Sequence, residues 1–194
     1  GYMDQSIKAC FPKFPPMVGY ALTSCFRSDA PPSGGDVYSS LDKQIDEYAK
    51  LPGAPVIVFQ DLDEPTASAT FGEVMCTTYK SFGAKGLITS GAGRDLDQVE
   101  ALGFSCFTNG TICAHGYCHI LSVGTPVSVG GITIYQGDLL HGDVSGVVSV
   151  PTDVAEATVG RAEEVRQFEA EYFEFLEGDR FNMDELRRRI QPPR

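Results

Sequence analysis

The stretch Gly86-Leu-Ile-Thr-Ser-Gly-Ala-Gly-Arg-Asp95 decides how this chain is expected to fold. Leu87-Ile88-Thr89 predict a short strand, and the small residues 90–93 allow the backbone to turn tightly into a helix that begins near Asp95. In open α/β sheets, ligands bind at the carboxyl ends of the strands. Arg94 and Asp95, displayed at such an end, are therefore candidate functional residues.

Strands and helices alternate in the residues that precede this stretch. β-branched and aromatic residues predict a strand over residues 18–26, and a continuous apolar run predicts a buried strand over residues 55–60. Apolar residues at helical spacing predict helices over residues 39–51 and 70–82. A loop is expected over residues 29–36, which are turn formers. This alternation is typical of α/β proteins.

The second half of the chain has a different pattern. Short apolar runs separated by glycine-containing turns occur at residues 104–107, 127–129, 132–135, 139–140 and 147–150. Such close spacing is typical of antiparallel hairpins rather than of helical crossovers. The sequence therefore predicts an α/β fold with a mixed, partly antiparallel sheet.

A helical tail is predicted to follow these strands. Its long first helix is expected to reach Leu176, with an apolar stripe formed by Val165, Phe168, Tyr172, Phe175 and Leu176. Gly178 is expected to end this helix as a C-terminal glycine. Asn182, followed three residues later by Glu185, resembles a capping box that opens a short last helix.

Length and composition limit the class of protein. The 194 residues carry a formal net charge of −11, with 42% hydrophobic and 21% charged residues, as in ordinary globular proteins. The negative charge argues against nucleic-acid binding and against an anionic membrane surface. No apolar run approaches the ~20 residues of a transmembrane helix, and no signal peptide pattern is present, so we expect a cytoplasmic protein. We expect an α/β domain over residues 1–151 and a helical tail over residues 152–194 that packs on the same or a neighbouring subunit.

The cysteines and histidines do not form a recognisable metal motif. We expect most of the six cysteines to be small buried hydrophobes. The run Cys113-Ala-His115-Gly-Tyr-Cys118-His119 holds four soft ligands, but structural zinc sites usually combine a closer cysteine pair with a distant second pair. We therefore expect no zinc site. His141, on a predicted strand, is interpreted as a hydrogen-bonded structural residue.

Residue types alone leave two interpretations of the central stretch open. The backbone N–H groups of Gly72-Glu73-Val74-Met75 open a helix and can bind a carboxylate or phosphate. Arg94 can form paired hydrogen bonds with a carboxylate, and Asp95 can bind a hard divalent cation. The alternative is that Asp95 only caps the following helix while Arg94 is a solvated surface charge.

Several motifs in the same order resemble the RraA-like family, which includes metal-dependent 4-hydroxy-4-methyl-2-oxoglutarate aldolases and regulators of ribonuclease activity. Gly72-Glu73, twenty intervening residues and then Arg94-Asp95 are similar to the D-x20-R-D signature of that family. Further similarity lies in the strand that ends at Asp61, in residues 86–95, in residues 130–138 and in residues 142–151. The resemblance covers residues 18 to about 178 and implies the swivelling β/β/α fold of the family.

The resemblance also implies roles for individual residues. The N–H groups of residues Gly72, Glu73, Val74 and Met75 would bind the carboxylate of a 2-oxo acid, and Arg94 would stabilise the developing enolate. Asp95 would bind Mg²⁺ or Mn²⁺, and Glu73 stands where the signature has Asp, which helps to order water on the metal. In the aldolases a carboxylate from a neighbouring subunit's C-terminal helix completes the metal shell. Glu169 and Glu171 are equal candidates for it.

The function implied by this resemblance is a metal-dependent lyase. It would cleave 4-hydroxy-4-methyl-2-oxoglutarate-type substrates to pyruvate by a retro-aldol reaction, decarboxylate oxaloacetate, or do both, within a homotrimer or hexamer. A Schiff base on Lys80 or Lys85 would be another way to stabilise the enolate, but these lysines are expected to be solvated. The alternative function is a non-catalytic RraA-like regulator that binds an RNA-processing enzyme.

Overall fold

The computed structural model of this chain describes residues 1–31, 40–178 and 182–190. The chain divides into two compact units, Gly1–Val150 and Pro151–Arg194. The loop expected over residues 29–36 and the start of the helix expected at residue 39 lie largely outside the described residues.

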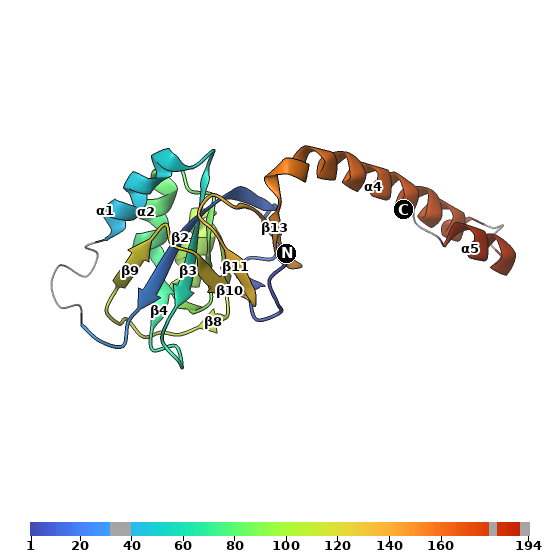
Figure 1. The fold of residues 1–194 in the computed structure, drawn as a ribbon. Helices are drawn as coiled ribbons and strands as arrows, with labels where there is room; N and C mark the ends of the chain where they lie inside the picture. Colours follow the sequence, from blue (N-terminus) through green and yellow to red (C-terminus); the bar gives the residue numbers. More distant parts are fainter. Residues whose placement is uncertain (32–39, 179–181, 191–194) are drawn as a thin grey trace. The chain divides into compact units, whose positions relative to one another are not determined.

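A mixed sheet forms the centre of the first unit (Figure 1). The strands β2 (Met17–Arg27), β3 (Pro55–Asp61), β5 (Gly86–Thr89) and β7 (Ser105–Thr108) are parallel neighbours in that order. The helices α1 (Leu41–Asp46), α2 (Glu73–Ser81) and α3 (Leu96–Leu102) connect them, and a 3₁₀ turn, η1 (Glu47–Lys50), follows α1. The predicted alternation of strands and helices is confirmed.

Antiparallel strands extend this sheet beyond β2. One end of β2 pairs with β12 (Leu139–Asp143), which pairs with β13 (Gly146–Val150), and the other end of β2 pairs with β9 (His119–Val123). The strands β10 (Val127–Val129) and β11 (Ile132–Ile134) form a separate antiparallel hairpin. The expectation of a mixed, partly antiparallel sheet is therefore confirmed.

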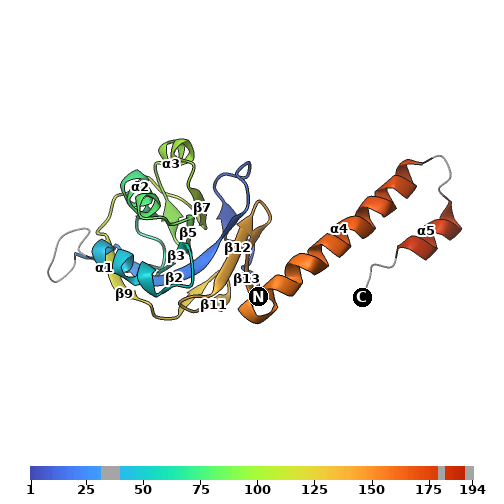
Figure 2. The same ribbon diagram turned by 90° about the horizontal axis from the view of Figure 1, so that it is seen from above.

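Alternation along the central strands produces two hydrophobic cores. Leu22, Ile57 and Leu87 belong to the core that contains Met75 and Tyr79 of α2. Their neighbours in the strands face the second core, which is closed by the hairpin and by residues of β12 and β13. Figure 2 shows α2 and α3 on one side of the sheet and β11 on the other. Because both faces of β3 and β5 are covered, these strands have continuous apolar sequences.

The first nine residues close the sheet between its two edge strands. The N–H of Ser149 in β13 donates to the carbonyl of Gly1 (2.8 Å), and the N–H of Met3 donates to the carbonyl of Val147 (2.9 Å). A few residues later, β1 (Lys8–Ala9) pairs with β7. One short segment therefore satisfies the backbone groups at both edges, which would otherwise be open to pairing with another chain.

Two local predictions were wrong, and one predicted strand is longer than its apolar run. The strand expected at residues 104–107 is β7, which runs parallel to β5 and is reached through α3, so it is not part of a hairpin. Residues 70 and 71 belong to the strand β4 (Ala69–Phe71) and not to the helix that follows, which begins only after Gly72. The strand expected at residues 139–140 continues to Asp143, because pairing with both β2 and β13 extends it.

The second unit contains a short 3₁₀ turn, η2 (Thr152–Val154), and the helices α4 (Ala155–Glu177) and α5 (Met183–Arg189). On α4, Phe168 stacks on Tyr172 with ring centroids 6.5 Å apart, and Arg189 of α5 lies 5.0 Å from the ring centroid of Phe175. Among the described residues, no helix is long and apolar enough to cross a membrane.

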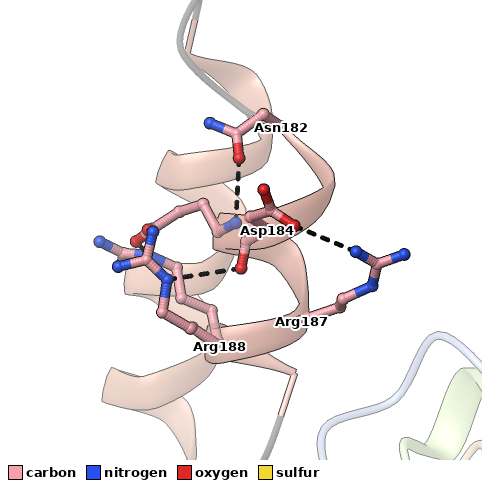
Figure 3. Close-up of polar contacts among 6 residues, drawn as sticks. Asn182, Asp184, Arg187 and Arg188 are labelled. Atoms are coloured by element: carbon pink, nitrogen blue, oxygen red, sulfur yellow. Dashed lines mark hydrogen bonds and ion pairs between the residues drawn. The ribbon is translucent and has the colours of Figure 1, made fainter.

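The start of α5 and the end of α4 lie at the residues that the sequence predicts. Asn182 caps α5, since its Oδ1 accepts a hydrogen bond from the N–H of Glu185 (3.0 Å), as the capping-box pattern predicts (Figure 3). Arg187 and Arg188 then hydrogen-bond to Asp184, which lies in the first turn of α5. Gly178 ends α4, as predicted, although its φ of −79° and ψ of 155° are extended rather than the left-handed values common at such glycines.

Candidate functional site

A small parallel sheet carries the residues of the predicted site. It consists of β4, β6 (Ala92–Gly93) and β8 (Gly110–Thr111), which pair in that order. The N–H of Arg94 donates to the carbonyl of Phe71 (3.1 Å), and the N–H of Ile112 donates to the carbonyl of Gly93 (3.1 Å). The chain therefore leaves all three strands at one edge, which places Gly72 beside Arg94.

Buried threonines attach this small sheet to the central sheet. The hydroxyl of Thr70 in β4 donates to Thr89 Oγ1 (2.9 Å) or to the carbonyl of Ala92 (3.1 Å), and the hydroxyl of Thr108 donates to the carbonyl of Gly91 (2.6 Å). Thr70 and Thr89 are fully buried, so these bonds satisfy groups that would otherwise be costly to bury. The position of the Arg94–Asp95 segment is thus determined by the core beneath it.

The glycines before Arg94 are required by packing. A Cβ on Gly91 would lie 2.4 Å from Asp61 Oδ2, and a Cβ on Gly93 would lie 2.2 Å from the ring of Phe71. Neither glycine has the left-handed backbone conformation that only glycine adopts easily. The sequence predicts small residues here because the backbone turns tightly. In the structure they are needed because neighbouring side chains approach the backbone closely.

Gly72, Arg94 and Asp95 are in direct contact. A Cβ on Gly72 would lie 2.6 Å from Asp95 Oδ2 and 3.0 Å from Arg94 Nε. Arg94 Nε is 3.8 Å from Asp95 Oδ2, and their side chains are 27% and 35% exposed. The fold thus brings Gly72, which precedes Glu73 of the spaced motif, and the Arg94–Asp95 pair together in space.

Asp95 binds the start of α2 and not the start of its own helix. Its Oδ2 accepts a hydrogen bond from the N–H of Glu73 (3.1 Å), whereas its side chain makes no capping bond to α3. Its φ of 55° is left-handed, a conformation that Asp and Asn tolerate better than most residues. The interpretation of Asp95 as a simple cap of the following helix is therefore wrong.

The first turn of α2 retains donors that can bind a ligand. The first bond of its helical ladder runs from the N–H of Cys76 to the carbonyl of Gly72 (3.0 Å). The N–H groups of Glu73, Val74 and Met75 precede that bond, and Asp95 takes the first of them. Val74 and Met75 are therefore better candidates for anion binding than Glu73, which contributes an exposed side chain beside Asp95.

A narrow pocket lies between this helix start and the loop that precedes β9. Val74, Met75 and Arg94 line one part of it, and His115 and Cys118 line another. The remaining lining residues are apolar or small: Phe26, Ala69, Phe71, Gly72 and Gly116. Arg94 and Asp95 also line a broader, open hollow together with Asp97 and Cys113. Arg94 therefore borders both spaces.

Sequence reasoning missed the loop side of this pocket. His115 and Cys118 were considered only as zinc ligands, and Phe26 only as part of a strand. The described residues contain no cluster of three or more His, Cys, Asp or Glu side chains placed to bind a metal. Of the six cysteines, Cys76 and Cys106 are buried, Cys113 is exposed and the others are half-buried. No signal in a single sequence indicates that residues 115–118 line the same pocket as the start of α2.

Asp61 is a second acidic residue close to the small sheet. Its N–H donates to Ser90 Oγ (2.9 Å), and its Oδ2 is buried without a hydrogen-bond partner among the described residues. Burial raises the pKa of the Asp61 carboxyl above its usual value. Ser90 thus supports the backbone of Asp61.

The two lysines that could form a Schiff base lie outside the pocket. Lys80 is exposed on α2, where its ammonium donates to the carbonyl of Leu102, and Lys85 is exposed before β5. Neither lines the pocket that contains Arg94. The positively charged group placed at that pocket is the Arg94 guanidinium.

The carboxylate of Asp95, beside Arg94, could bind a divalent cation that takes only one or two of its ligands from the first unit. Asp95 is partly exposed, and its Oδ1 has no hydrogen-bond partner among the described residues. Mg²⁺ is commonly bound through one or two carboxylates, with the remaining ligands supplied by water and substrate. Asp95 therefore fits such an ion. Glu169 and Glu171 lie on α4 in the second unit, and their role in a neighbouring site stays a prediction.

The fold and the site together define an α/β protein with a small pocket, lined by Arg94 and the start of a helix, at the carboxyl edge of a parallel sheet. The model of the RraA-like family, described as Aldolase/RraA, matches residues 1–149. The chain therefore belongs to the RraA-like family, as the sequence motifs predict.

Individual relatives agree with this assignment. The chain is 32% identical over 116 residues to a Halalkalibacterium halodurans protein named "Putative 4-hydroxy-4-methyl-2-oxoglutarate aldolase", covering 59% of this chain and 54% of that protein. It is 25% identical to Protein DlpA of Legionella pneumophila, covering 68% of this chain and 21% of that protein. The chain thus spans about half or less of the length of these relatives.

A solved structure shows the same fold. Streptomyces coelicolor RraAS2, described as an unusual member of the RNase ES inhibitor RraA protein family, superimposes with a TM-score of 0.69 and 24% identity. The match covers 87% of this chain and 81% of that chain. The predicted RraA-like fold class is confirmed.

Proposed function

We propose that this protein is a divalent-metal-dependent lyase of 2-oxo acids. It cleaves 4-hydroxy-4-methyl-2-oxoglutarate-type substrates to pyruvate, and the same chemistry allows it to decarboxylate oxaloacetate. The observation that carries the proposal is the contact of Gly72, Arg94 and Asp95 at the edge of a pocket with free helix donors. The named aldolase relative supports the same class of reaction.

Different residues of the pocket bind the substrate carboxylate and stabilise the negative charge that develops during the reaction. The N–H groups of Val74 and Met75, at the positive end of α2, bind the carboxylate of the 2-oxo acid. Arg94 faces the keto oxygen and stabilises the negative charge that develops there when the carbon–carbon bond breaks. Because Phe26 and Phe71 line the pocket, the charges interact there in a less polar medium than water.

Asp95 is the residue that would hold Mg²⁺ or Mn²⁺. A bound divalent cation supplies Lewis-acid polarisation of the keto group. Asp95 is oriented for this role by its bond to the N–H of Glu73 and by the Arg94 side chain beside it. The Glu73 carboxylate, longer by one methylene than the Asp of the family signature, assists at the same edge.

The assay that tests the lyase function measures pyruvate release from both substrates, with Mg²⁺, Mn²⁺ or EDTA present. We expect pyruvate from at least one substrate with metal, and loss of that activity in EDTA that added metal restores. Absence of pyruvate under every condition would refute the lyase and favour the alternative, a non-catalytic regulator that binds an RNA-processing enzyme. The fold that this chain shares with Streptomyces coelicolor RraAS2 is the observation that favours that alternative. Assembly as a homotrimer or hexamer and a cytoplasmic location are part of the same proposal.

A methyl group at Gly72 tests the contact that defines the site. We expect Gly72→Ala to lower pyruvate release about tenfold, because the new Cβ displaces the Asp95 carboxylate and the Arg94 guanidinium from their positions. The φ of Gly72 is −156°, which alanine adopts without strain, so the protein stays folded. Gly110→Ala is the matched control, since a Cβ on Gly110 meets nothing within 4 Å. Equal activity of the two variants would show that the contact is not needed.

A further inference from the structure

The pocket contains few groups that can accept a proton. Among its lining residues, the side chains that titrate are Arg94, His115 and Cys118. An arginine guanidinium does not lose its proton in proteins. Burial raises the pKa of the Cys118 thiol to about 11, so that thiol is protonated at neutral pH. His115 is the remaining base in the lining.

The hydrogen bond made by His115 selects which ring nitrogen is available. Its Nδ1 lies 2.9 Å from the carbonyl oxygen of Gly116. A carbonyl oxygen only accepts hydrogen bonds, so Nδ1 carries the proton and the neutral ring has its lone pair on Nε2. Nε2 has no partner among the described residues. The imidazole is therefore in the tautomer that a proton acceptor requires.

The backbone on both sides of His115 is attached to the core. The N–H of Ala69 donates to the carbonyl of Ala114 (3.1 Å), and the N–H of Tyr117 donates to the carbonyl of Ser28 (3.3 Å). A Cβ on Gly116 would lie 2.4 Å from Ser68 Oγ, so the loop packs closely here. His115 is thus presented from an anchored loop.

Ser28, to which the loop is bonded, is itself hydrogen-bonded to a buried carboxylate. Asp63, which is 7% exposed, accepts hydrogen bonds from the N–H (2.7 Å) and the hydroxyl (2.8 Å) of Ser28. Arg27 Nε lies 3.3 Å from the other oxygen of Asp63. The two hydrogen bonds to Asp63 Oδ2 restrict the position of Ser28, the residue after β2 to which the loop is bonded.

We propose that His115 is the catalytic proton acceptor for the 4-hydroxyl group of the substrate, an inference that rests on the retro-aldol function proposed above. Nε2 takes the hydroxyl proton, and the O–H electron pair forms the new C4=O bond. The C3–C4 bond breaks, and its electron pair forms the enolate of pyruvate, whose negative oxygen faces Arg94. The imidazolium then returns the proton to C3, so protons and electrons balance without another reactant.

The two candidate reactions differ in their need for this base. Decarboxylation of oxaloacetate also breaks the C3–C4 bond and forms the same enolate, but its leaving group is CO₂ and no hydroxyl proton is removed. We therefore expect His115→Gln to lower kcat for cleavage of 4-hydroxy-4-methyl-2-oxoglutarate about 100-fold, the usual contribution of a general base, and to change oxaloacetate decarboxylation by less than about threefold. Affinity for oxalate, which lacks the hydroxyl group, should stay unchanged.

Two further variants separate catalysis from structure. His119→Gln changes the other histidine of this segment, which lies in β9 and does not line the pocket, and it should cleave both substrates like the wild type. Free imidazole should restore cleavage to His115→Ala, because a small base can enter the space left by the ring. Thermal denaturation of each variant checks that it is folded.

Distinct outcomes overturn this inference or the function on which it rests. An equal loss of both activities in His115→Gln would show a binding or structural role, and no loss would show that another group takes the proton. A selective loss in Glu73→Gln, with His115→Gln normal, would assign the base to Glu73. A wild-type protein that only decarboxylates oxaloacetate would refute the role of His115 alone, whereas one that releases no pyruvate would refute the lyase function as well.

Discussion

Replacing Arg94 by alanine is expected to lower kcat/KM for pyruvate release about 10³-fold, the upper range for loss of one charge-stabilising donor. The guanidinium lines the pocket and lies against Gly72, so it is close to the oxygen that becomes negative. Steady-state kinetics on both substrates measure the loss. Because both substrates give the same enolate, both activities should fall together, unlike the selective effect expected at His115.

Stability should change little in Arg94→Ala. The ion pair with Asp95 is long, at 3.8 Å, and the side chain is 27% exposed, so its removal should alter the free energy of unfolding by about 1 kcal/mol or less. The backbone bond from Arg94 to Phe71 does not involve the side chain. Arg166→Ala, which removes a surface ion pair on α4, is the control. Full activity of Arg94→Ala would show that the site is assigned wrongly.

Replacing Asp95 by asparagine is expected to abolish metal-dependent activity. The change removes the negative charge that attracts a divalent cation and keeps an oxygen that can accept the N–H of Glu73. Asparagine also tolerates the left-handed backbone at this position, where φ is 55°. Calorimetric titration with Mn²⁺ should show weakened binding, and unfolding experiments should show nearly unchanged stability. Unchanged affinity for Mn²⁺ would exclude Asp95 as a ligand.

Alanine at the same position should have a second effect. Asp95→Ala loses the bond to the first turn of α2 and places an alanine in left-handed backbone, at a combined cost of about 2 kcal/mol in unfolding free energy. The comparison of the two variants separates the role of the charge in metal binding from the role of the carboxylate in joining α2 to α3. Equal stability of the two variants would contradict the structural role.

The strands and helices of the first unit follow from patterns that a single sequence contains. Continuous apolar runs such as residues 55–60 predict buried strands because both of their faces are covered, and glycine-containing turns predict the hairpins of β10–β13. Which strands pair with each other does not follow from these patterns. Residues 104–107 have the length and flanking turns of a hairpin strand, yet they pair in parallel with β5, because α3 brings the chain back to the same edge.

For the candidate site, too, the sequence predicts one aspect, the identity of the residues. The motif that contains Arg94 and Asp95 is contiguous, and its distance along the chain from Glu73 is that of a family signature, so these residues could be named from the sequence. Their contacts could not. The bond from the N–H of Glu73 to Asp95 joins residues 22 positions apart, and it replaces the capping of α3 that local pattern suggests.

The class of fold, the family and the identity of Arg94 and Asp95 follow from the sequence, because these depend on local periodicity and on short motifs with set spacing. Three features are seen in the folded protein alone: Gly72 must lack a side chain, the first residues close the sheet, and His115 lines the same pocket as Arg94. Those features arise from contacts between segments distant along the chain. Such contacts form only when the two cores are packed, so no local pattern of residues encodes them.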